Sequence, residues 1–286
     1  MEKQVQWFPG HMAKAYRLIR EKISVVDVVI EVIDARCPIS SINDSLKEVI
    51  GSKPLLLVMN KTDLADPKQN KIFLDELNKN YLAIALNSLT GTKNLNEITK
   101  AIEILLKNKL EKAKSQGKNI YPIKAMVVGI PNVGKSTLLN NLAKRRALNV
   151  GDRPGVTKAM QYLKANDKLL LLDNPGTLWP KFKDQEQAKV LALIGSIKDD
   201  VLPLQEIVIF GINKMKDLYP NNLKERYNLE ELSDNPYSIL EAIGKRRGAL
   251  LKGGEIDLEK ANDIFLKDLR SGKLGAMTFE RINWFI

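Results

Sequence analysis

The sequence predicts an α/β fold: a doubly wound, mostly parallel sheet, followed by an all-helical domain. Two observations support this. Near-continuous apolar runs alternate with stretches of helical spacing up to about residue 180, and beyond that point the apolar runs stop. Such runs are typical of parallel strands buried on both faces, and strand–helix alternation is typical of a doubly wound sheet. We therefore expect a sheet domain at 1–181 and a helical domain at 182–286.

The expected strands are the five apolar runs, which are partly β-branched: 25–33, 54–59, 81–86, 123–129 and 168–173. Helical spacing predicts the helices between and around them: 11–24, 64–79, 94–114 and 136–146. The lysine-rich segment 107–119 ends near a glycine and indicates a helix end with a surface linker. The sheet domain is thus expected to have two strand-bearing halves joined by this linker.

The composition gives the chain a strongly positive net charge. The 286 residues hold 45 Lys and Arg against 34 Asp and Glu, a net charge of +11. This excess favours a polyanionic partner, nucleic acid before anionic lipid, although a lysine-rich proteome would give the same balance. The single cysteine, Cys37, excludes an internal disulfide and a cysteine-based zinc cluster, and we expect it to be a small buried hydrophobe. With no apolar run long enough to span a membrane and no signal or transit peptide, we expect a cytoplasmic monomer.

Residues 129–136 read G-I-P-N-V-G-K-S, a full match to the GxxxxGK[ST] phosphate-binding loop between an expected strand and helix. Backbone N–H groups and the helix N-terminus in such a loop bind the phosphates of a nucleoside triphosphate. We expect Lys135 to reach the β- and γ-phosphates and the Ser136 hydroxyl to bind Mg²⁺. The other expected nucleotide-binding residues of the loop are Asn132, Val133, Gly134 and Thr137.

Two downstream motifs complete the expected triphosphate site. D-N-P-G at 173–176 follows an expected strand, so that Asp173 completes the Mg²⁺ shell through a water and the Gly176 N–H meets the γ-phosphate. Between this motif and the phosphate loop lies Thr157, which can coordinate Mg²⁺ from a mobile loop.

A guanine-reading motif lies upstream of the phosphate loop. Asn60-Lys61-Thr62-Asp63 matches N-K-x-D directly after an apolar strand. The Asp63 carboxylate would accept from guanine N1–H and the exocyclic amine, Lys61 would lie along the ring, and Asn60 would support loop and base. Because adenine would leave the carboxylate poorly paired, Asp63 selects guanine. The similar string N-K-M-K-D at 213–217 places a lysine where the carboxylate must be, so we do not expect it to bind the base.

The next expected strand ends at Asn87-Ser88-Leu89, which suits backbone contact to the guanine O6. The motifs therefore run base-reading, base-supporting, phosphate loop, Thr loop and D-x-P-G, whereas an ordinary GTPase begins with the phosphate loop. A circular permutation of the same sheet explains this order, because folds tolerate permutation where the old termini are close.

This order, with W-F-P-G-H-M-A-K-A at 7–15 and K-R-R-G-A-L-L-K-G-G-E-I-D at 245–257, resembles the circularly permuted GTPases of the YlqF class over essentially the whole chain. The resemblance implies a GTP-hydrolysing factor that uses GTP, GDP and Mg²⁺, docks on rRNA and acts in late maturation of the large ribosomal subunit. It also implies that Asn132 helps bind a K⁺ ion, for which a loop-stabilising role is the alternative.

The sequence identifies the catalytic residue less clearly than the nucleotide-binding residues. Thr177 follows D-N-P-G where many GTPases have the Gln that orients the attacking water, and Thr is too short for that role. We therefore expect turnover to be slow alone and stimulated by the ribosomal particle. The only histidine, His11, can position a water when neutral, and the resemblance implies that it swings toward the γ-phosphate. The alternative is a His11 that contacts rRNA or the core.

Two basic clusters are candidate rRNA contacts, for which a solvated charged face is the alternative: Lys245, Arg246, Arg247 and Lys252 near the end of the chain, and Lys14, Arg17 and Arg20 on one helical face. Affinity through such phosphate contacts falls steeply with salt. Two other functions stay open. One is an RNA-binding scaffold with GTP as a structural ligand and negligible turnover. The other is a membrane-linked GTPase, which is disfavoured because no basic amphipathic helix or lipidation signal is present.

Overall fold

The computed structural model describes residues 10–143, 162–173, 184–199 and 203–284. Contacts divide these residues into two compact units. The sheet unit contains residues 10–63, 67–143 and 162–173, and the helical unit contains residues 64–66, 184–199 and 203–284. Within the described residues, no helix combines the length and the apolar character needed to cross a bilayer.

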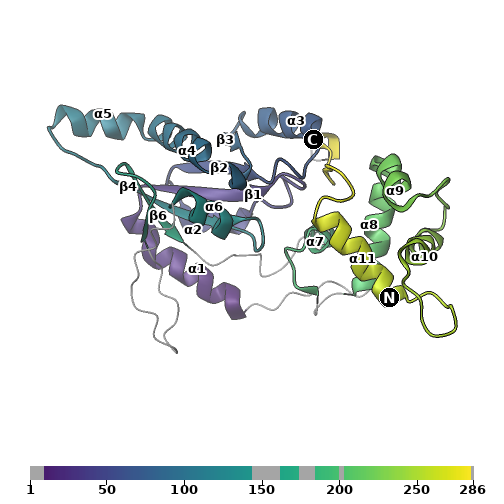
Figure 1. Cartoon of the computed structure of the whole chain (residues 1–286). Helices are drawn as coiled ribbons and strands as arrows, with labels where there is room; N and C mark the ends of the chain where they lie inside the picture. The colour runs from purple at the N-terminus through teal and green to yellow at the C-terminus, as the bar shows by residue number, and fades with distance from the viewer. Residues whose placement is uncertain (1–9, 144–161, 174–183, 200–202, 285–286) are drawn as a thin grey trace. The chain divides into compact units, whose positions relative to one another are not determined.

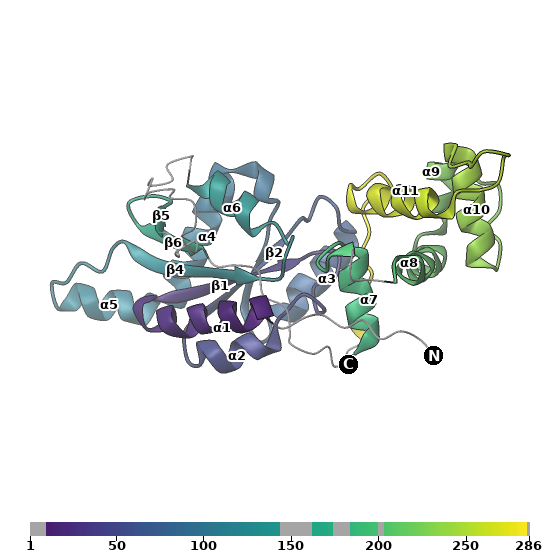
Figure 2. The same ribbon diagram turned by 90° about the horizontal axis from the view of Figure 1, so that it is seen from below.

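Within the described residues the sheet has six strands in the order β3-β2-β1-β4-β6-β5 (Figures 1 and 2). All neighbours pair in parallel except β5, which is antiparallel to β6. The five predicted strands are confirmed, and the sixth, β5, was missed because three residues at an edge are too short to show a period. The strands are β1 (Val28–Asp34), β2 (Leu55–Asn60), β3 (Leu82–Ala85), β4 (Ile123–Gly129), β5 (Tyr162–Lys164) and β6 (Leu169–Asp173).

The central strands form the core of the sheet unit. Every residue of β1 is buried, and in β4 only Lys124 is exposed. Continuous apolar strands require cover on both faces. Helices α1 and α2 lie against one face and α4 and α6 against the other (Figure 2). The helices of this unit are α1 (Gly10–Lys22), α2 (Asp44–Ile50), α3 (Pro67–Leu77), α4 (Thr92–Leu105), α5 (Lys107–Ser115) and α6 (Lys135–Leu142), with 3-10 turns η1 (Ile23–Val25) and η2 (Ser88–Thr90).

Two helix predictions need correction. The predicted helix 94–114 is two helices, because the chain leaves helical geometry at Leu106 (φ −99°, ψ 11°) between α4 and α5. The predicted helix 64–79 begins only at Pro67, where the fixed φ of proline suits a first helical position. Residues 64–66 instead belong to the helical unit.

The described part of the helical unit contains no strand, as predicted for the chain after residue 180, apart from an isolated bridge between Leu250 and Ile256. Its helices are α7 (Gln185–Leu193), α8 (Leu204–Leu218), α9 (Pro220–Tyr227), α10 (Pro236–Arg247) and α11 (Leu258–Arg270), with a 3-10 turn η4 (Ile282–Trp284). Side chains of Asp184, Asn235 and Asp257 cap the first turns of α7, α10 and α11. The rejected N-K-M-K-D string lies inside α8, so it forms no base-reading loop.

Candidate functional site

The carboxyl ends of the parallel strands bring the predicted motifs to one edge of the sheet. Asp34 of β1 is in register with Asn60 of β2, and Asp173 of β6 is in register with Val127 of β4, just before the phosphate loop. The base-reading motif and the phosphate loop are separated by about seventy residues in sequence. The parallel topology is therefore what places them side by side.

Two glycines allow the phosphate loop to approach its neighbours closely. Gly129 has a φ of 144°, and a Cβ there would lie 2.3 Å from the Val32 carbonyl oxygen. Gly134 has a φ of 97°, and a Cβ there would lie 2.4 Å from the Asn60 amide nitrogen. Asn132 also adopts a positive φ, 58°. Side chains at the glycine positions would push the loop away from both β1 and the base-reading motif.

Lys135 lies inside this loop. The residue is 7% exposed, and its Nζ donates to the carbonyl oxygens of Gly129 (2.9 Å) and Ile130 (2.8 Å). Burial lowers the pKa of Lys135 to about 8, against the opposing attraction of Asp173. These two carbonyl oxygens therefore hold the Lys135 ammonium group inside the phosphate loop. Ser136 and Thr137 follow in the first turn of α6 and are exposed.

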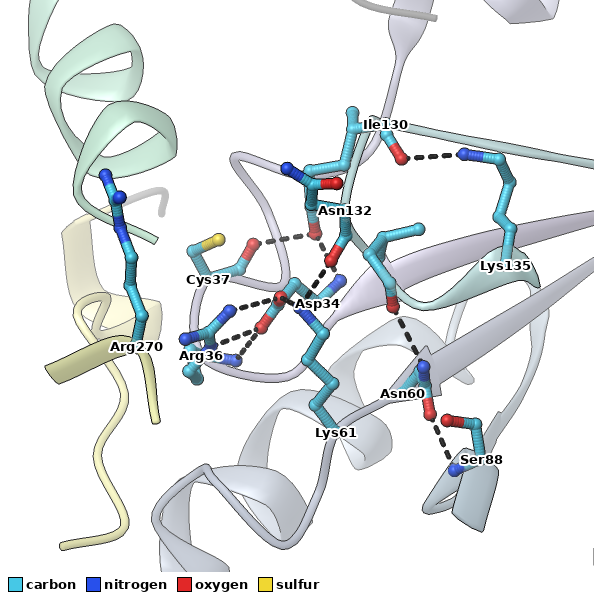
Figure 3. A network of polar contacts seen from close by, with 12 residues as sticks. Asp34, Arg36, Cys37, Asn60, Lys61, Ser88, Ile130, Asn132, Lys135 and Arg270 are labelled. Carbon is cyan, nitrogen blue, oxygen red and sulfur yellow. Dashed lines mark hydrogen bonds and ion pairs between the residues drawn. The ribbon is translucent and has the colours of Figure 1, made fainter. Parts of the chain in front are cut away.

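Asn60 joins three of the predicted motifs. Its side chain is buried; Nδ2 donates to the Val133 carbonyl (2.8 Å), and Oδ1 accepts from the Ser88 N–H (2.9 Å). One amide group therefore links the base-reading motif to the phosphate loop and to the base-supporting loop (Figure 3). This agrees with the loop-supporting part of the role expected for Asn60.

Lys61 makes a second link to the phosphate loop. Its backbone is left-handed, with a φ of 61°, and its Nζ donates to the Asn132 carbonyl oxygen at 2.5 Å. The same Nζ lies 3.0 Å from Oδ2 of Asp34. Asp63, the predicted guanine-reading carboxylate, is exposed two residues further on.

The base-supporting loop is held from both sides. The Asn87 side chain accepts from the Leu89 N–H (2.9 Å), while its carbonyl accepts from Asn94 of α4 (2.6 Å). The Asn141 side chain of α6 donates to the Ser88 carbonyl (2.7 Å). Leu89 is 68% exposed. These bonds fix the backbone of the loop and leave its tip open to a ligand.

Asp34 and Arg36 are site residues that the sequence reasoning missed. Asp34 is fully buried and accepts from Arg36 Nε (2.9 Å) and Nη2 (2.8 Å) as well as facing Lys61. Burial alone would raise the pKa of Asp34, but the two adjacent cations hold it well below its usual range. An available signal was D-A-R directly after an apolar strand, since polar residues there lie at the functional edge of a parallel sheet.

The oxygen donors at this edge suit Mg²⁺. The Ser136 hydroxyl opens α6, and the half-buried Asp173 carboxylate ends β6, the neighbour of β4. Hydroxyl and carboxylate oxygens are the protein ligands that Mg²⁺ prefers, used together with nucleotide phosphates. The other predicted residues of the triphosphate site, Thr157 and Gly176, lie outside the described residues, as does Thr177.

The N-terminal candidates are placed only in part. Gly10–Lys22 is helical, which confirms the predicted first helix. His11 and Lys14 lie on this helix, and their side chains are outside the described part of the structure. Arg17 and Arg20 are exposed, and Arg17 pairs with Glu21 at 3.6 Å.

The C-terminal basic cluster is exposed at the end of α10 and in the turn that follows. Within the described part of the chain, Lys245, Arg246 and Lys252 form no ion pair. Arg247 is engaged within the unit: Nη2 donates to the Arg226 carbonyl (2.9 Å), and the guanidinium lies 5.3 Å from the Tyr227 ring centre. Arg247 therefore contributes to packing, while the other three present their charge to solvent.

The sheet order, the phosphate loop on β4 and a base-reading motif upstream of it define a circularly permuted P-loop GTPase. A family model described as "50S ribosome-binding GTPase" matches residues 124–241. The chain is similar to ribosome biogenesis GTPase A of Bacillus cereus, with 48% identity covering 96% of this chain and 93% of the relative. It is also similar to mitochondrial ribosome-associated GTPase 1 of Bos taurus, with 31% identity covering 96% and 88%.

Solved structures agree with this assignment. The fold matches GNP-bound YlqF from T. maritima with a TM-score of 0.68 and 26% identity, covering 94% of this chain and 98% of that one. It matches GDP-bound TM YlqF with a TM-score of 0.67. The chain belongs to the ribosome biogenesis GTPase A family, and it is a GTPase of ribosome biogenesis.

Proposed function

We propose that this GTPase binds the precursor of the large ribosomal subunit through its rRNA, in the cytoplasm, and acts late in the maturation of that subunit. The observation that carries the nucleotide-binding part of the proposal is the pair of hydrogen bonds made by the Asn60 side chain, which joins the base-reading motif to the phosphate loop and to Ser88. The family description "50S ribosome-binding GTPase" and the net charge of +11 support a large-subunit partner.

The residues of the site have distinct roles in this proposal. Asp63 reads guanine, and Asn87, Ser88 and Leu89 present backbone to the base. Lys135 exchanges its carbonyl partners for phosphate oxygens, with Asn132, Val133, Gly134 and Thr137 lining the loop and Gly176 following the γ-phosphate. Ser136, Thr157 and Asp173 hold Mg²⁺, which offsets phosphate charge when bound, and Asn132 helps hold K⁺.

Hydrolysis in this proposal is slow in the free protein and stimulated by the particle, with His11 as the candidate catalytic residue. A neutral imidazole near the γ-phosphate can position the attacking water. We expect His11→Ala to abolish the stimulation of GTP turnover while leaving affinity for the particle within about twofold. Single-turnover GTP hydrolysis on saturating large subunits measures this. Undiminished stimulation in the variant would show that His11 is an anchor and that another group catalyses.

The helical unit is the proposed rRNA-binding domain, 182–286. Lys245, Arg246 and Lys252 are its best candidates because their charges are exposed and unpaired among the described residues. Lys14, Arg17 and Arg20 form the second candidate contact on α1. Phosphate contacts of this kind position a protein without reading sequence.

Co-sedimentation with purified ribosomal subunits tests the proposal. In K⁺ and Mg²⁺ buffer with a non-hydrolysable GTP analogue, we expect the chain to pellet with large subunits and to remain in solution with small subunits. Lys245→Gln/Arg246→Gln should weaken pelleting most at low salt, and the difference from wild type should shrink as salt rises, because the variant makes fewer salt-dependent phosphate contacts. Equal binding to both subunits would contradict the proposal. Specific binding with no stimulated turnover would favour the scaffold function instead.

A further inference from the structure

Helix α5 lies at the end of the sheet opposite to the nucleotide site. The segment that follows it enters β4 at Ile123, the amino end of the strand, whereas the phosphate loop leaves β4 at its carboxyl end. Figures 1 and 2 both show α5 continuing from α4 past the end of the strands. A ligand bound at α5 would therefore not compete with GTP.

The helix and its exit carry a concentrated positive charge. Residues 107–118 contain five lysines and one glutamate, Glu111. Lys109 is paired with Asp27 at 2.6 Å. The other four, which are exposed and have no ion-pair partner within the described ranges, are Lys107, Lys112, Lys114 and Lys118. Ala113 is the only residue of α5 that is buried, so this helix contributes little to the core of the sheet unit.

A pocket of about 460 Å³ opens beside these lysines. This volume falls within the range of about 300–1,000 Å³ found for small-molecule sites. Tyr121 at its wall is fixed by a hydrogen bond from its hydroxyl to Glu103 (3.1 Å) and by the Lys168 ammonium, 5.6 Å from the ring centre. The lining includes apolar side chains, two lysines and one carboxylate: Leu110, Ile120, Tyr121, Lys114, Lys118 and Glu111.

We propose that α5 and residues 116–121 form a second RNA-binding site, which takes an unpaired nucleotide. Its base enters the pocket beside Tyr121, and the flanking phosphates meet Lys114 and Lys118. An aromatic wall next to cations is the combination that binds single-stranded nucleic acid without sequence preference. An acidic peptide would also pair with the lysines, but every base of an RNA strand has a π-face that can stack beside Tyr121, which favours RNA as the ligand. The inference rests on the proposed function, since it assigns the same partner, rRNA, to a second surface.

The test uses the full-length protein and a 12-nucleotide single-stranded RNA that carries 2-aminopurine, titrated at several KCl concentrations. We expect Lys114→Gln/Lys118→Gln to weaken binding several-fold and to reduce the slope of log K against log salt by about 1.4, which is about 0.7 per phosphate contact on a single strand. Tyr121→Leu should remove the 2-aminopurine fluorescence change and leave that slope nearly unaltered, because it removes stacking and no charge.

Lys71→Gln/Lys79→Gln, which removes one exposed lysine of α3 and one exposed lysine in the turn after it, is the control and should alter neither quantity. GDP affinity of every variant checks that the sheet unit is folded. Unchanged slopes in the α5 variants, with RNA binding lost in Lys245→Gln/Arg246→Gln, would overturn this inference and leave the proposed function standing. Poly-glutamate of equal charge competing as well as the RNA would also overturn it. Failure of the proposed function would appear separately, as wild-type protein that does not bind large subunits.

Discussion

At the scale of single residues, the site depends on a buried charge cluster. Asp34 is enclosed between the Arg36 guanidinium and the Lys61 ammonium, and Lys61 in turn contacts the phosphate loop through Asn132. Removing one partner of a buried pair leaves the others uncompensated, which is strongly destabilising. Asp34 is therefore expected to hold Lys61 against the loop.

Asp34→Asn should lower the free energy of unfolding by about 3–5 kcal/mol and weaken GDP binding. Because Asp34 acts through Lys61, the same substitution should cost less GDP affinity in a Lys61→Met background. Isothermal titration of the four proteins in this double-mutant cycle measures the coupling. Equal losses in both backgrounds would mean that Asp34 does not position Lys61.

Glu31 predicts a pH dependence of stability. It is buried in the middle of β1, where it accepts from the Asn43 N–H (2.7 Å), and burial raises the pKa of this carboxyl from 4.5 to about 7. Between pH 4.5 and 7 the folded chain keeps a proton that the unfolded chain has lost. The proton on Glu31 therefore stabilises the folded chain fully below pH 4.5. As the pH rises from 4.5 to 7, the free energy of unfolding falls by up to about 1.4 kcal/mol per pH unit.

Glu31→Gln, which stays neutral and keeps an acceptor oxygen, should remove this dependence and be more stable than wild type at pH 8. Urea unfolding at pH 5, 6, 7 and 8 measures it. Glu48→Gln, at an exposed carboxyl of α2, is the control and should follow wild type. Parallel pH profiles for wild type and Glu31→Gln would contradict the assignment.

At the scale of elements, the phosphate loop shows why glycine is required. Gly134→Ala would force a Cβ against the Asn60 amide, so we expect it to separate the loop from the base-reading motif and lower GDP affinity at least tenfold. Gly51→Ala is the matched control: its φ is also positive, at 56°, but nothing lies within 4 Å of the added Cβ. It should cost about 1 kcal/mol of stability from backbone strain and leave GDP affinity intact. Equal GDP affinities for the two variants would contradict the argument.

The elements themselves were largely predictable. Apolar runs located the five longer strands because central parallel strands are buried on both faces, and the phosphate loop and base-reading motif have fixed local patterns. The break at Leu106 and the edge strand β5 were not predictable, since neither changes the apolar period. The contact of Asp34 with Lys61 joins residues at the ends of two neighbouring strands, β1 and β2, whose pairing a local pattern does not specify.

At the scale of the whole molecule, the order of motifs predicted the permuted sheet, and the structure and relatives confirm it. Two halves of one nucleotide site come from distant parts of the sheet unit and meet through Asn60 and Lys61. The partner and the catalytic group were less predictable than the fold. The net charge indicated a polyanionic partner, and the lone histidine indicated His11 as a candidate for catalysis. The large ribosomal subunit and the movement of His11 toward the γ-phosphate were predicted only through the family resemblance.

Activation of GTP hydrolysis by a large ribosomal subunit is the step of the proposed function on which the rest depends. The most direct measurement is the rate of phosphate release from GTP in K⁺ and Mg²⁺ buffer, for the protein alone, with purified large subunits and with small subunits. We predict at least a tenfold higher rate with large subunits and no increase with small ones. A rate that large subunits leave unchanged, at concentrations where the protein is bound to them, would contradict the claim.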